Sequence, residues 1–105
     1  MTDQASIRWT SDTILEFLST QSELLHAMGV IRIGLFGSYV RGEQHPESDI
    51  DILLTIENWT WKRWAAIWDF LENSFELKVD LVPEADLRPE IERNILAEVR
   101  YATLD

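Results

Sequence analysis

The stretch GSYVRGEQHPESDIDILL, residues 37–54, holds the features that decide the fold of this 105-residue chain. Gly37 and Ser38 follow a run of β-branched and apolar residues, so they are expected to end a strand. A glycine directly after a strand permits a sharp turn and leaves room for a ligand. If Ser38 opens a short helix, the free N–H groups at its start can bind a phosphate. A Gly-Ser pair in this position is, however, more often only a turn.

Asp49 and Asp51 are separated by one residue in a strand predicted over residues 49–55. Side chains two positions apart on a strand project from the same face, so the two carboxylates can reach a common point. Their negative charges repel unless a cation lies between them, and magnesium prefers such oxygen ligands. The pair therefore predicts either a metal site or the exposed polar face of an edge strand.

Asp80 is the third carboxylate of interest, because it lies between apolar residues in KVDLV, residues 78–82. A carboxylate in the middle of a predicted strand needs a partner or a metal if it is buried. If its strand neighbours the strand of Asp49 and Asp51, the three carboxylates converge. They would then bind two metal ions, with Asp80 also close to an attacking hydroxyl group.

The remaining pattern predicts an α/β (α+β) protein with a small mixed β-sheet flanked by helices. Apolar residues at helical spacing indicate one helix, or two joined helices, over residues 12–28, and the Thr13–Glu16 spacing fits a capping box. Another helix is predicted over residues 60–74, and Pro89 fits the first turn of a last helix. Strands are predicted at residues 30–36, 49–55 and 77–82.

The chain contains five tryptophans, three of them in the predicted helix 60–74. Trp61, Trp64 and Trp68 fall on one helical face, and such an aromatic stripe is typical of a core. Trp9 and Trp59 lie off that face, as does Phe70. If these side chains are exposed, they favour contact with a protein partner.

Length and composition indicate one domain, residues 1–105, with a single core. The absence of cysteine excludes disulfides and thiolate metal sites. The formal net charge of -10 disfavours binding to a nucleic-acid polymer and favours a basic protein partner, unless it serves solubility alone. No apolar run approaches the roughly 20 residues of a membrane span, and the N-terminus lacks signal-peptide features. We therefore expect a cytoplasmic protein without membrane contact.

The joint pattern resembles the signature of the minimal nucleotidyltransferases (MNT), which belong to the DNA polymerase β-like superfamily. That signature is Gly-Ser, ten residues and Asp-x-Asp, which Gly37, Ser38, Asp49 and Asp51 match at the same spacing. KVDLV resembles the strand that carries the family's third carboxylate, and PEIERNILAEVRYA is similar to the family's last helix. The resemblance extends over about residues 24–101 and implies the polymerase β-like nucleotidyltransferase fold.

The resemblance also implies metal-dependent transfer of a nucleotidyl group, with ATP as the expected substrate. Asp49, Asp51 and Asp80 would bind two Mg²⁺ ions, which would also reconcile an acidic protein with a triphosphate. Asp80 would in addition help to deprotonate the acceptor hydroxyl.

The same resemblance assigns the triphosphate to the Gly-Ser pair. The backbone of Gly37 and Ser38, with the Ser38 hydroxyl, would hold the β and γ phosphates. Arg41 would either contact a phosphate or tie the loop to a carboxylate.

Short solitary domains of this family resemble the antitoxin of a two-gene pair, whose other product is a helical HEPN toxin with ribonuclease activity. By that resemblance, the chain transfers AMP from ATP to a tyrosine of the toxin and silences it. Two other functions stay open. One is nucleotidylation of an antibiotic, which generally needs a further domain for the drug; the other is a binding module that neutralises a partner by contact alone.

Overall fold

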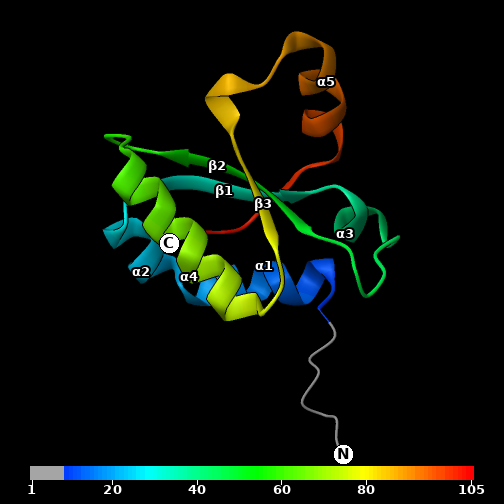
Figure 1. Ribbon diagram of the computed structural model, residues 1–105, viewed down its shortest axis with the longest axis horizontal. Helices are drawn as coiled ribbons and strands as arrows, with labels where there is room; N and C mark the ends of the chain where they lie inside the picture. Colours follow the sequence, from blue (N-terminus) through cyan, green and yellow to red (C-terminus); the bar gives the residue numbers. More distant parts are fainter. Residues whose placement is uncertain (1–8) are drawn as a thin grey trace, which may run out of the picture.

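The computed structural model describes residues 9–105, which form a four-stranded sheet with helices on both sides (Figure 1). The helices are α1 (Ser11–Thr20), α2 (Ser22–Ala27), α3 (Ser38–Arg41), α4 (Trp61–Phe75) and α5 (Pro89–Glu98), with a 3-10 helix, η2 (Glu84–Asp86), before α5. The strands are β1 (Val30–Phe36), β2 (Ile50–Ile56), β3 (Val79–Pro83) and β4 (Arg100–Tyr101). None of these helices has both the length and the apolar character needed to cross a membrane.

The sheet has the order β3-β2-β1-β4, and its pairings are of both kinds. β1 pairs antiparallel with β2 and with β4, whereas β2 and β3 are parallel. A parallel pair needs a crossover connection, which α4 provides here. The α/β (α+β) class and the mixed sheet predicted from the sequence are therefore confirmed.

The main core lies between one face of the sheet and the helices α1, α2 and α4, which Figure 1 shows together on one side. The sheet contributes alternate residues of its strands, including Ile33, Leu35, Ile50 and Ile52. α5 lies on the other side of the sheet and has no buried residue. Leu53 faces that side and is nevertheless fully buried, so both faces of β2 are covered at its centre.

The aromatic face of α4 is rotated relative to the prediction. Trp64 is buried with Ile67, whereas Trp61 is 74% exposed and Trp68 is 37% exposed. The prediction of a tryptophan core stripe was therefore wrong for two of its three members. Their spacing fits a helical face but cannot show which of two overlapping faces meets the sheet.

The aromatic residues placed off that stripe have different environments. Trp59 is 44% exposed and contacts the Trp61 ring edge-on, with 4.7 Å between the centroids. Trp9 and Phe70 instead pack against the core, and the indole N–H of Trp9 donates to the Phe75 carbonyl. The candidate protein-contact aromatics are thus Trp59 and Trp61 rather than Trp9 and Phe70.

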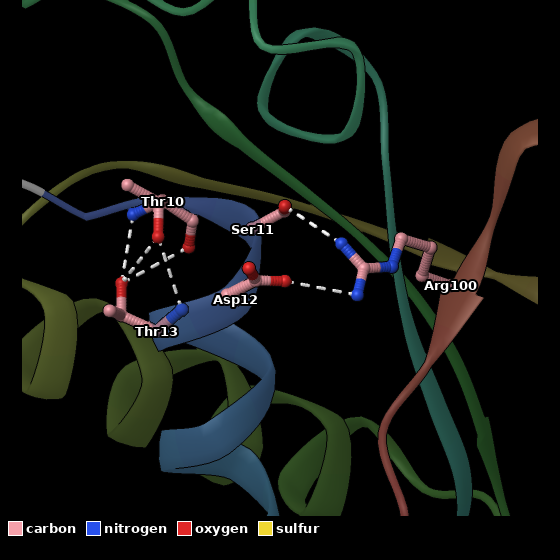
Figure 2. A network of polar contacts seen from close by, with 5 residues as sticks. All are labelled: Thr10, Ser11, Asp12, Thr13 and Arg100. Carbon is pink, nitrogen blue, oxygen red and sulfur yellow. Dashed lines mark hydrogen bonds and ion pairs between the residues drawn. The ribbon is translucent and has the colours of Figure 1, made fainter.

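The first helical segment is two helices, and its N-terminal cap differs from the predicted one. Thr10 is the N-cap of α1: its hydroxyl accepts from the Thr13 N–H, and the Thr13 hydroxyl accepts from the Thr10 N–H (Figure 2). The Thr13–Glu16 capping box was therefore wrong by three residues. Threonine at both positions satisfies the same two backbone donors as the expected threonine and glutamate.

β4 is an element that the sequence analysis did not predict. It pairs Tyr101 with Gly34, and the close packing of Val99 and Tyr101 on Gly34 leaves no room for a side chain there. Arg100 donates to the Ser11 hydroxyl at 2.9 Å and pairs with Asp12 at 3.1 Å (Figure 2). A strand of only two residues is therefore held in part by its contact with the start of α1.

The outer edge of β3 is closed by two side chains of α4. The indole N–H of Trp68 donates to the Val79 carbonyl at 2.8 Å, and the Val79 N–H donates to the Glu72 carboxylate at 2.8 Å. An open strand edge presents unpaired backbone groups to other chains. These two bonds satisfy such groups and fix β3 beside α4, with Asp80 as the next residue.

Trp68→Phe tests this contact, because it keeps an aromatic ring and removes the N–H donor. The Val79 carbonyl loses its partner, so we expect the free energy of unfolding to fall by about 1 kcal/mol in urea denaturation, with an unchanged m value. Trp61→Phe is the matched control, and its effect should stay within about 0.5 kcal/mol. Equal losses in both variants would contradict the role of the indole N–H.

Candidate active site

The sheet register brings two of the three predicted carboxylates to the same level. Asp51 pairs with Phe36 across the antiparallel ladder and with Asp80 across the parallel one. Residues paired in this way point to the same face of a sheet. Asp51 and Asp80 are each the second residue of their strands, so the parallel pairing of β2 and β3 is what makes them neighbours.

Asp49 lies directly before β2 and is exposed, as is Asp80, whereas Asp51 between them is partly buried. Although Asp49 precedes the strand, its negative charge acts on Asp51 together with that of Asp80. No set of three acidic or histidine side chains in residues 9–105 is arranged to hold a metal ion by itself.

Gly37 joins β1 to α3, and its position explains why a glycine is needed. Its φ is 81° and its ψ is -153°, a combination that side chains disfavour. A Cβ atom there would overlap the carboxylate of Asp51. The absence of a side chain thus lets the turn approach the central carboxylate, which links the Gly-Ser pair to Asp51 physically.

Ser38 begins α3, a helix of one turn, so the condition stated for phosphate binding at this turn is met. The Gly37 carbonyl accepts from the N–H groups of Val40 and Arg41. The N–H groups of Ser38 and Tyr39 are in the first turn, so they have no acceptor within the helix. Ser38 is only partly buried. Residues 37–42, here called the Gly-Ser loop, therefore present backbone donors next to the carboxylates.

Arg41 forms ion pairs with two glutamates. Its Nε lies 2.9 Å from Glu43, and its Nη1 lies 3.0 Å from Glu98. Of the two roles considered for Arg41, these contacts support the tie to a carboxylate. They also leave the guanidinium at the edge of the Gly-Ser loop, where its positive charge offsets a part of the rise in the pKa of Asp51 that burial and the neighbouring carboxylates cause.

Glu98 is a site residue that the sequence analysis did not identify. It is the last residue of α5, and its carboxylate accepts from the Gly37 N–H at 2.7 Å as well as from Arg41. A signal was present in the sequence. Carboxylates are disfavoured at the C-terminal end of a helix, where the helix dipole is negative, so a glutamate there needs a specific partner.

The electrostatics of the site favour a cation. The pKa of Asp51 is raised to about 6, first by burial and then by the negative charges of Asp80 and Asp49. Hard oxygen donors that repel one another in this way are the ligands that Mg²⁺ prefers. The chemistry of Asp49, Asp51 and Asp80 therefore suits a divalent metal ion, although their side chains do not form a complete coordination site by themselves.

A mixed sheet with a Gly-Ser loop packed against paired strand carboxylates defines a nucleotidyltransferase. Residues 11–102 match the family model described as the nucleotidyltransferase domain, and the chain belongs to that family. The resemblance to the minimal nucleotidyltransferases is thereby confirmed, and the protein is an enzyme of this class.

Known relatives have the same fold over most of their length. The chain is 40% identical over 82 residues to the protein adenylyltransferase MntA of Thermococcus cleftensis. The aligned region covers 77% of this chain and 83% of that protein. A solved structure described as a minimal nucleotidyltransferase has a TM-score of 0.75 and 29% identity, covering 89% of this chain and 96% of the other.

A more distant solved structure is that of a tri-AMPylated Shewanella oneidensis HEPN toxin in complex with an MNT antitoxin. Its TM-score is 0.60 at 18% identity, and the match covers 87% of this chain and 73% of the other. At this identity, the likeness is one of fold.

The raised pKa of Asp51 predicts that stability falls as pH rises through about 6. The folded protein binds this proton more tightly than the unfolded chain, so the contribution is present below the ordinary pKa of 3.8 and is lost above the raised one. In metal-free buffer at pH 7.5, we expect Asp51→Asn to be more stable than wild type by on the order of 1 kcal/mol, allowing for solvent screening.

The measurement is thermal or urea unfolding from pH 5 to pH 8, with Asp69→Asn as the control, since Asp69 is an exposed aspartate of α4. The advantage of Asp51→Asn should shrink towards pH 5, and Asp69→Asn should show no such trend. A pH-independent difference would mean that the ionisation of Asp51 is not its cause.

Proposed function

We propose that this protein transfers AMP from ATP to a tyrosine hydroxyl of a HEPN-type toxin and thereby acts as an antitoxin. The observation that carries the proposal is the contact of the Gly-Ser loop with Asp51, at the level where Asp51 pairs with Asp80. Backbone N–H groups suited to a phosphate and carboxylates suited to a metal ion thus lie next to each other. The protein adenylyltransferase relative and the toxin–antitoxin fold neighbour support AMP as the group and a HEPN protein as the acceptor.

In this proposal, Asp49, Asp51 and Asp80 would hold two Mg²⁺ ions. When bound, such ions neutralise phosphate charge and lower the barrier to displacement at phosphorus.

The chain's own groups would then position the reactants. The N–H groups of Ser38 and Tyr39 and the Ser38 hydroxyl would hold the β and γ phosphates, while Gly37, whose own N–H donates to Glu98, would shape the turn. The tyrosine oxygen attacks the α phosphorus, the bond from that phosphorus to the β-phosphate oxygen breaks, and pyrophosphate leaves. The phenolic proton passes to the Asp80 carboxylate, whose exposure makes it accessible to an acceptor protein. Catalysis in this scheme depends on positioning and charge rather than on a covalent enzyme intermediate.

ATP affinity should rise with magnesium, because the three aspartates repel a bare triphosphate and need a cation between. Calorimetry should give an ATP dissociation constant at least about tenfold lower in excess Mg²⁺ than in chelator. ADP and inorganic phosphate serve as controls for the number of phosphates required. Equal ATP affinity in magnesium and in chelator would count against the proposed metal site.

Asp51→Asn separates catalysis from binding of the partner. It preserves shape but removes a central charge, and a misplaced reactant alone costs on the order of 100-fold in rate. We expect transfer of radiolabel from ATP to a co-expressed HEPN-type protein to fall at least that far, while the complex still forms. Ser38→Ala should have a milder effect, because the backbone donors remain, and Asp69→Asn should match wild type.

The same variants test the antitoxin function in cells that express the HEPN-type protein. Wild type and Asp69→Asn should restore growth, whereas Asp51→Asn should bind the partner without protecting the cells. Full protection by Asp51→Asn would instead support a binding module that neutralises its partner by contact.

A further inference from the structure

Glu98 lies opposite the Gly-Ser loop because of the β1–β4 register. β4 pairs Arg100 with Leu35 and Tyr101 with Gly34, and the same antiparallel alignment continued outward brings Glu98 level with Gly37. Its carboxylate accepts the Gly37 N–H at 2.7 Å and the Arg41 Nη1 at 3.0 and 3.2 Å. One side chain from the end of α5 therefore holds both ends of α3.

The surroundings of this carboxylate are otherwise unfavourable. Glu98 ends a helix, where its charge opposes the dipole. It also adds to the negative charge around Asp51. Its side chain is only 24% exposed, so water does not compensate fully. The hydrogen bonds to Gly37 and Arg41 are the interactions that offset these costs, since charge-assisted hydrogen bonds are the strong ones.

The contact also anchors α5, which has few other means of attachment. No residue of α5 is buried, and Ile91 and Leu96 are 47% and 42% exposed. The residue at the other end of this contact, Gly37, has access to many backbone conformations because it is a glycine. A fixed acceptor for its N–H selects one of them, and with it the direction of the Ser38 N–H and hydroxyl.

We propose that Glu98 is a positioning residue for nucleotide binding: its carboxylate holds the Gly37 amide and the Arg41 side chain so that the Gly-Ser loop is preformed for the triphosphate. This inference rests on the proposed nucleotidyl transfer and adds to it a residue from outside the family signature. Because the loop contacts the phosphates before and during transfer, loss of Glu98 should act on substrate binding more than on the chemical step.

The test compares Glu98→Ala and Glu98→Gln with Glu92→Ala and Glu92→Gln, since Glu92 is an exposed glutamate of the same helix. We expect Glu98→Ala to raise both the KM for ATP and the calorimetric Kd of ATP with Mg²⁺ by about tenfold, as the loss of a charge-assisted hydrogen bond implies. The kcat should change less than threefold. Glu98→Gln keeps an acceptor for the Gly37 N–H and should recover part of the affinity, and the Glu92 variants should match wild type.

The amide resonance of Gly37 in a ¹H–¹⁵N spectrum gives a readout that does not depend on activity. A hydrogen bond to a carboxylate shifts an amide proton downfield, so the Gly37 signal should move upfield in Glu98→Ala and remain in an intermediate position in Glu98→Gln. If the wild type transfers no AMP, the proposed function fails, while the resonance and the ATP Kd still test Glu98. An unchanged Kd and an unchanged Gly37 resonance in folded Glu98→Ala would overturn the inference, as would tighter ATP binding.

Discussion

The parallel pairing of β2 with β3 places Asp51 beside Asp80, and the rest of the site is arranged around this pair of carboxylates. Asp51 also lies against the turn at Gly37, where no side chain fits. Burial and like charges together raise the pKa of Asp51. Acidic groups held together in this way favour a bound cation, and in the proposed function a metal ion with a triphosphate provides that compensation.

The positions of the two carboxylates and of the turn at Gly37 depend on contacts with residues outside the family signature. α4 closes the edge of β3 through Trp68 and Glu72, which fixes the strand that carries Asp80. On the opposite side of the sheet, Glu98 fixes the turn that meets Asp51. α4 and the end of α5 therefore fix the two segments that flank Asp51, which are β3 and the turn at Gly37. The signature supplies the reactive groups, whereas α4 and the end of α5 determine where those groups lie.

Local patterns made much of this arrangement predictable. The strand over residues 30–36 was predicted because β-branched residues and a glycine boundary act over a few positions. The one-turn helix after Gly37 was only a condition, because a Gly-Ser pair is more often a turn. Asp51 lies in its expected strand, whereas Asp49 precedes it. The neighbouring position of Asp80 could only be stated as a condition, because a sequence pattern does not encode which strands pair.

The features that escaped prediction depend on contacts between distant residues. β4 has only two residues, too few for any periodicity, and it exists because Gly34 lets Val99 and Tyr101 approach. Trp68 lies at the edge of the core and its indole N–H donates to a backbone carbonyl of β3. Helical spacing alone cannot reveal such a contact. Glu98 gave a local sign, a carboxylate at the wrong end of a helix, but its partner lies 61 residues away. A residue that is locally unfavourable is therefore a useful pointer to a distant contact, since the fold must supply what the local sequence does not.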